Sequence, residues 1–99
     1  MMKRNEAITA LKSCADAIKA HGATSLFLFG SSARDEARPG SDLDLFVDYD
    51  PQDKFSLVDL VDIKLYLEDR LGVPVDITTR DSLHPMLRRG IENTAVRVF

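Results

Sequence analysis

The sequence predicts an α/β (α+β) fold, with a small mixed β-sheet of about three strands flanked by helices, in a single domain spanning residues 1–99. Three observations support this prediction. Short apolar runs bounded by turn residues alternate with stretches of helical periodicity. Ninety-nine residues are enough for one domain and not for two. A hydrophobic content of 44% is typical of a folded chain and not of a disordered one.

The first half of the chain is predicted to hold two helices and two strands. Apolar residues from Ile8 to Ile18 recur at steps of three and four, which indicates a helix over residues 3–20 that Gly22 ends. The elements that follow are a buried strand, a short helix, a turn and a second strand, expected over residues 25–29, 31–37, 39–40 and 43–49.

The second half is predicted to contain a long helix, a strand and a last helix. Ser56 with Asp59 resembles a capping box that opens the long helix, and Gly72 ends it. Its core face is expected to comprise Val58, Val61, Leu65, Leu67 and Leu71. A strand over 73–78 and a helix from about Pro85 follow; Asp81 or Ser82 is the expected cap of this helix, and its expected apolar side is Leu87, Ile91 and Ala95.

Composition narrows the classes of function. Thirteen basic and 16 acidic residues give a net charge of −3, which disfavours direct nucleic-acid binding because such binding depends on cationic neutralisation of phosphates. The single cysteine, Cys14, falls on an apolar helix side and is expected to be a buried, inert thiol. No stretch is long and apolar enough for a membrane span or a secretory signal, so we expect a cytoplasmic protein.

Two carboxylates share one face of the second predicted strand. Side chains alternate along a strand, so Asp42 and Asp44 project to one side, and Leu43 and Leu45 project to the other. Two like charges at this spacing repel, and a divalent cation between them removes the repulsion. Oxygen ligands suit Mg²⁺, with Mn²⁺ as an alternative. If the third strand is a neighbour, Asp76 joins them, and three carboxylates can hold two metals.

The residues upstream of Asp42 and Asp44 strengthen the prediction that this acid pair is functional. Twelve of the 16 acids are aspartate, so chance alone can produce such a pair, and we interpret a second one, Asp48 with Asp50, as structural. Upstream, however, Gly30 closes a strand and Ser31 opens a helix. That junction presents free backbone N–H groups and a favourable helix dipole to an anion. Together these features suit a nucleoside triphosphate.

Gly30-Ser31, ten residues and then Asp42-Leu43-Asp44 resemble the signature of the DNA polymerase β-like nucleotidyltransferase superfamily. The stretches FGSSARDEARPGSDLDLFV and LGVPVDITT are similar to the MNT-type minimal nucleotidyltransferases. The resemblance implies that Gly30 and Ser31 contact the triphosphate. It also implies that Asp42 and Asp44 are catalytic metal ligands and that Asp76 is the third acid.

Other residues near the motif leave alternatives open. Ser41 is a candidate for a nucleotide contact, with a plain turn role as the alternative. Arg34 and Arg38 are candidates for a phosphate or acceptor contact, against a solvated surface role. Asp35 departs from the family, in which glycine is frequent; its extra acid either weakens nucleotide binding or points to solvent.

The resemblance also implies a partner. MNT proteins are paired with HEPN toxins and act as antitoxins by transferring AMP from ATP to a toxin tyrosine. The chain is too short for a separate acceptor-binding domain, which fits an acceptor hydroxyl delivered by a partner. The alternatives are a non-catalytic, nucleotide-binding antitoxin that neutralises its partner by contact, transfer to a small molecule, and a plain α/β domain with coincidental acids.

Overall fold

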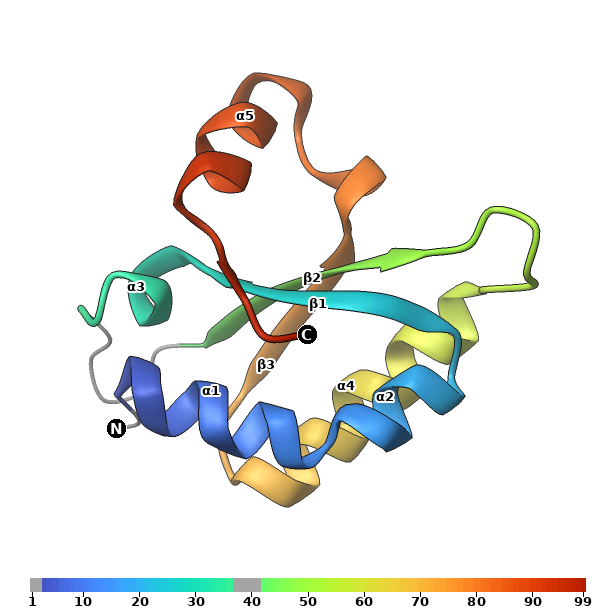
Figure 1. The fold of residues 1–99 in the computed structure, drawn as a ribbon, viewed down its shortest axis with the longest axis horizontal. Coiled ribbons are helices and arrows are strands. Elements are labelled where there is room, and N and C mark those ends of the chain that lie inside the picture. The colour runs from blue at the N-terminus through green and yellow to red at the C-terminus, as the bar shows by residue number, and fades with distance from the viewer. Residues whose placement is uncertain (1–2, 37–41) are drawn as a thin grey trace.

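The computed structural model describes residues 3–36 and 42–99 (Figure 1). Its elements, in chain order, are α1 (Arg4–Ser13), α2 (Ala15–Ala20), β1 (Ala23–Phe29), α3 (Gly30–Ala33), β2 (Leu43–Tyr49), α4 (Leu57–Leu71), β3 (Val75–Thr79), the 3-10 turn η1 (Arg80–Ser82), α5 (Pro85–Thr94) and β4 (Val96–Arg97). The predicted order of helices and strands is confirmed, and the strand ends differ from the prediction by at most two residues.

The strands form a mixed sheet in the order β3-β2-β1-β4. β1 is antiparallel to β2 and β4, whereas β2 and β3 are parallel. The predicted small mixed sheet is therefore confirmed, with four strands in place of three. The additional strand, β4, is only two residues long, which is too short for a period-two pattern to reveal it in the sequence.

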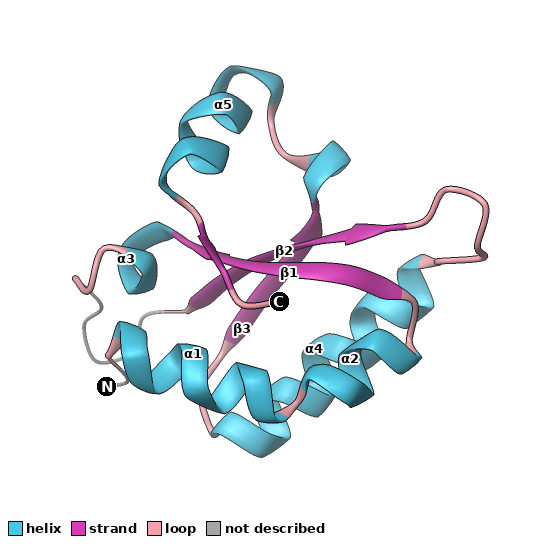
Figure 2. Cartoon of the chain, viewed as in Figure 1, coloured by secondary structure: helices cyan, strands magenta, loops and turns pink. Residues whose placement is uncertain are grey.

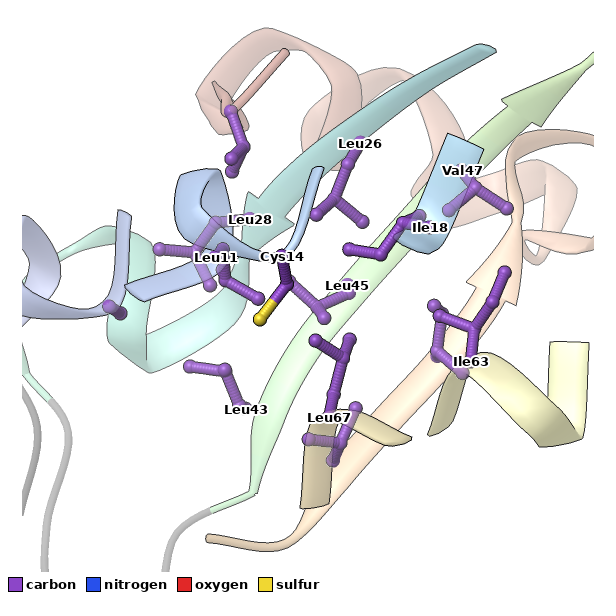
Figure 3. Packing of buried hydrophobic residues seen from close by; sticks show 14 of the residues in the cluster. Leu11, Cys14, Ile18, Leu26, Leu28, Leu43, Leu45, Val47, Ile63 and Leu67 are labelled. Carbon is purple, nitrogen blue, oxygen red and sulfur yellow. The ribbon is translucent and has the colours of Figure 1, made fainter. Parts of the chain in front are cut away.

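Helices lie on both sides of the sheet (Figure 2). α1, α2 and α4 cover one face, and α5 stands on the opposite side. The main core lies under the three covering helices, where alternate residues of the strands point toward Leu11, Cys14, Ile18, Ile63 and Leu67 (Figure 3). Burying each such leucine or isoleucine contributes roughly 1.5–3 kcal/mol to folding.

The predicted first helix is interrupted. Residues 4–20 form α1 and α2, joined at Cys14, whose φ of −99° and ψ of 4° depart from α-helical values. The Cys14 amide donates to the Leu11 carbonyl at 3.0 Å, a bond to the third residue back that tightens the chain there. Cys14 is buried, as expected for an inert thiol.

The ends of α4 are as predicted, and its core face is not. The Ser56 amide donates to the Asp59 carboxylate at 3.0 Å, and the Asp59 amide donates to Ser56 Oγ at 3.4 Å, which forms the capping box. Gly72 ends the helix with a φ of +69°. The buried residues are Ile63 and Leu67.

The predicted core residues Val58, Val61 and Leu65 are exposed. Apolar residues occur all round this helix, so periodicity alone does not fix which face is buried. The sheet selects the face that carries Ile63 and Leu67, with Leu60 and Leu71 partly buried beside it. The prediction was right for Leu67 and Leu71 and wrong for the other three.

The last helix also differs in detail. The N-cap of α5 is His84, whose Nδ1 accepts from the Met86 amide at 3.2 Å, so the expectation of Asp81 or Ser82 as the cap is wrong. Those two residues lie in η1, one turn earlier. Leu87, expected on the apolar side, is exposed, while Ile91 and Ala95 are half-buried. Within the described ranges, no helix is both long and apolar enough to cross a membrane.

Candidate active site

The acidic residues of the motif gather at one end of the sheet. Asp44 of β2 is the register partner of Asp76 in parallel β3, so their side chains share a face. Asp42 lies just before β2 and is exposed. On its other side Asp44 is paired with Phe29 of β1. The conditional prediction that Asp76 joins the acid pair if the two strands are neighbours is thus supported by the strand register.

Asp44 is held in an unfavourable environment for a negative charge. Its pKa is raised above the ordinary aspartate value, first by burial and then by the charges of Asp76 and Asp42, while Arg34 opposes the rise. Carboxylates that lie close together with no cation between them repel one another, and this repulsion disfavours their ionised forms. The same repulsion favours binding of a cation at this site.

Gly30 lies directly against this carboxylate. Its φ is +73°, and a β-carbon built on it would overlap Asp44 Oδ2 and lie 3.2 Å from Asp44 Cγ. Only glycine allows the backbone to pass so close in this conformation. The motif glycine therefore serves to bring the start of α3 next to the acids, in addition to the phosphate approach that the sequence suggests.

α3 is a single turn that begins at Gly30, with extended Phe29 as its N-cap. The amides of a first turn have no intrahelical acceptors, so those of α3 are available to an anion. Ser31 is half-buried beside them. Arg34 closes the turn, is exposed and donates from Nε to Glu36 at 3.1 Å. Ser41 and Arg38 lie outside the described residues.

Asp35 has a structural role. Its φ of 59° lies in the left-handed region, which glycine adopts with less strain than aspartate. Its carboxylate accepts from the Arg4 amide at 2.9 Å, at the start of α1. A negative charge there offsets the positive end of the helix dipole. The carboxylate of Asp35 is thus engaged by α1.

The donor set suits a hard divalent cation. Asp42, Asp44 and Asp76 offer carboxylate oxygens alone, which Mg²⁺ and Mn²⁺ prefer. Across residues 3–36 and 42–99, no three Asp, Glu, His or Cys side chains already converge as a metal-binding group. The residues that would hold the cation are Asp42, Asp44 and Asp76, and oxygen ligands of this kind suit Mg²⁺ when phosphates complete the set.

Sequence reasoning missed a network on the same sheet face. The Arg80 guanidinium donates to both oxygens of Asp48, at 2.7 and 3.0 Å, and to Glu92 of α5 at 2.6 Å. It also stacks over the rings of Phe27 and Phe46, 4.8 and 5.0 Å from their centroids. These carboxylates hold the pKa of Arg80 above its usual value. Arg80 therefore ties α5 to the sheet.

The second acid pair is structural, as interpreted. Asp48 forms the ion pair with Arg80, and Asp50 Oδ1 accepts from the Gln52 amide at 2.9 Å in the following turn. Next to Asp48, Tyr49 donates to Asp81 at 2.7 Å, and this bond raises the pKa of the phenol. Asp81 sits in η1, far from Tyr49 in sequence, so no local pattern signals the bond.

Comparisons with known proteins show which family the chain resembles. The sequence signature of the family described as "Nucleotidyltransferase domain" matches residues 11–98. A "Putative protein adenylyltransferase" of Methanocaldococcus jannaschii is 44% identical over 79 residues, which cover 80% of this chain and 83% of the relative.

The fold is shared with solved structures. The "Structure of putative minimal nucleotidyltransferase" superposes with a TM-score of 0.83 at 36% identity and covers 97% of this chain and 96% of the other. The "Crystal structure of the toxin-antitoxin with AMP-PNP" includes a chain with a TM-score of 0.71 at 16% identity, covering 89% of this chain and 72% of the other.

Proposed function

Because this chain belongs to the nucleotidyltransferase domain family, we propose that it transfers AMP from ATP, with Mg²⁺, to a tyrosine hydroxyl of a partner HEPN toxin in the cytoplasm and so acts as an antitoxin. The observation that carries the proposal is the placement of Asp44 opposite Asp76 and against Gly30. The adenylyltransferase name of the relative and the toxin–antitoxin complex among the structural neighbours support it.

Different residues act on the nucleotide and on the acceptor. Gly30 and Ser31 bind the triphosphate through first-turn amides and the serine hydroxyl. Arg34, next to that turn, contributes positive charge toward the phosphates. Asp42 and Asp44 would hold the cation. When bound, Mg²⁺ neutralises the phosphate charge and stabilises the leaving pyrophosphate.

Asp76 serves the acceptor side. It is exposed on β3, whereas Asp44 beside it is half-buried, so an incoming protein reaches Asp76 more readily. During transfer the tyrosine oxygen bonds to the α-phosphorus, the bond from that phosphorus to the bridging oxygen of pyrophosphate breaks, and Asp76 accepts the phenol proton. The products are O-adenylyl-tyrosine and pyrophosphate.

The test uses purified chain, α-³²P-labelled ATP, Mg²⁺ and the HEPN protein from the same genome. We expect label on the HEPN protein, and loss of at least a hundredfold in rate with Asp44→Asn or Asp76→Asn. Asp69→Asn, an exposed change at the end of α4, is the matched control and should retain the wild-type rate. No transfer of label with any nucleoside triphosphate refutes the proposed activity.

The same variants distinguish catalysis from neutralisation by contact. If Asp42→Ala with Asp44→Ala still protects cells fully from the HEPN protein, the chain acts as a binder and the transfer is dispensable. If protection is lost while binding of the partner persists, transfer is the protective step.

A further inference from the structure

α5 presents an exposed apolar tip on the side of the sheet that carries the acids. Met86 and Leu87 in its first turn are 87% and 61% exposed. Every residue of the helix is at least partly accessible. α5 stands on the opposite side of the sheet from α1, α2 and α4 (Figure 1). Its anchor, Arg80, stacks on Phe46, which shares the face of β2 that bears Asp44.

A ten-residue helix with no buried side chain lacks the packing that normally stabilises helices of this length. Arg80 to Glu92 is its principal polar tie to the sheet, and Gly90 in its interior lowers its intrinsic stability. The apolar tip thus contributes nothing to this chain's own core. Such a tip is typical of a surface that another molecule covers.

The charge around α5 indicates what covers it. Residues 80–99 carry four arginines and two acids, whereas residues 1–79 carry nine basic and 14 acidic residues. Arg89 is exposed beside the tip. Next to it, a pocket of about 190 Å³ opens between α5 and the end of β2, and its charged lining residues are Arg80, Arg88, Asp48 and Asp81. Asp48 and Glu92 pair with Arg80 and Arg88, whereas Arg89 is in no ion pair among the described residues, so it is the positive charge that α5 offers to another molecule.

We propose that Met86, Leu87 and Arg89, here called the α5 surface, dock the acceptor protein of the transfer reaction. The occupant is a different protein whose contact region combines apolar side chains with carboxylates. The inference rests on the proposed function, because it places the acceptor on the same side of the sheet as Asp76. Asp48, which binds the Arg80 that anchors α5, is four residues from Asp44 on β2, about 13 Å along the strand. A protein docked on α5 therefore also reaches the acidic site.

A second copy of this chain fits the α5 surface less well. In a symmetric pair the same patch meets itself, so Arg89 of one copy approaches Arg89 of the other. The second copy brings no carboxylate to this patch that could offset the repulsion. The exposed apolar residues of α4, Val58 and Leu65 among them, lie on the far side of the sheet from Asp76. A protein bound there is on the wrong side to present its hydroxyl. These residues provide a matched control.

The experiment measures binding of the purified HEPN protein from the same genome by calorimetry without nucleotide, so catalysis is not needed for the readout. We expect Met86→Ser with Leu87→Ser, and separately Arg89→Glu, to weaken the Kd at least tenfold. Val58→Ser with Leu65→Ser should leave it unchanged. Circular dichroism and binding of a fluorescent ATP analogue should match the wild type for all variants. In the transfer assay the KM for the HEPN protein should rise, with kcat retained.

The docking proposal is overturned if the α5 variants keep the wild-type affinity, if the α4 control loses as much affinity as they do, or if the wild-type chain does not bind. A change in sedimentation of the chain alone on altering α5 also overturns it, because the surface then joins copies of this chain. Binding that depends on α5 without any transfer of AMP supports the docking surface and refutes the proposed activity.

Discussion

Replacing Gly30 by alanine tests whether the close approach of α3 to Asp44 shapes the site. The substitution has two separate costs. A residue with a β-carbon in the left-handed region costs roughly 1–2 kcal/mol, whatever surrounds it. The β-carbon also overlaps Asp44 Oδ2, so the carboxylate must turn away from its place on β2. An off-rotamer side chain adds about 1 kcal/mol.

Gly72 supplies the matched control. Its φ of +69° is close to the +73° of Gly30, yet a β-carbon there meets nothing within 4 Å. Gly72→Ala thus carries the backbone cost alone. We expect Gly30→Ala to be the less stable variant by about 1 kcal/mol, which corresponds to a Tm roughly 4–8 °C lower in a domain of this size. Displacing Asp44 by an ångström should also reduce AMP transfer about a hundredfold.

Thermal unfolding followed by circular dichroism, together with the transfer assay, provides both readouts. Gly72→Ala should lose stability and keep its activity at temperatures where it is folded. Equal Tm values for the two variants, together with full activity of Gly30→Ala, refute the reasoning that the carboxylate and the turn are in close contact.

Two further predictions concern carboxylates whose roles the structure separates. Because burial, Asp76 and Asp42 raise the pKa of Asp44, the folded chain holds that proton more tightly than the unfolded chain, and ionised Asp44 opposes folding. Without metal, Asp44→Asn should therefore raise the Tm at pH 7, and the gain should vanish below about pH 4; an unchanged Tm at pH 7 contradicts this. Denaturant unfolding should show that Asp35→Ala lowers the free energy of unfolding by about 1 kcal/mol, because the contact with the Arg4 amide is lost. Asp35→Gly should lower it less, because glycine relieves the strain of the positive φ. The reverse order contradicts the structural role of Asp35.

Local patterns predicted the elements whose signals are themselves local. β2 runs over 43–49 as expected because Leu43, Leu45 and Val47 recur at period two on one face. α4 begins at the Ser56–Asp59 capping box and ends at Gly72, because a cap is a contact between residues close in the chain. Strand alternation predicted that Asp76 joins Asp44 only if their strands are neighbours, and the parallel pairing of β2 and β3 meets that condition.

Features set by distant contacts escaped prediction. The buried face of α4 is chosen by the sheet, since both sides of that helix carry apolar residues. Arg80 finds its partners 32 residues upstream at Asp48 and 12 residues downstream at Glu92, and neither spacing corresponds to a helix or strand repeat. β4 depends on pairing with β1, some 70 residues earlier, and its two residues carry no periodic signal.

That pairing of β4 with β1 bears on how the chain folds during synthesis. Phe27 and Leu28 pair with Arg97 and Val96, and the Val98 amide donates to the Leu26 carbonyl at 2.8 Å. The outer edge of β1 therefore stays unpaired on the ribosome until β4, some 70 residues later, has emerged. Long-range pairing of this kind slows folding, and an open strand edge favours association with other chains in the interval. The two residues of β4 thus protect the edge of a strand that is synthesised about 70 residues before them.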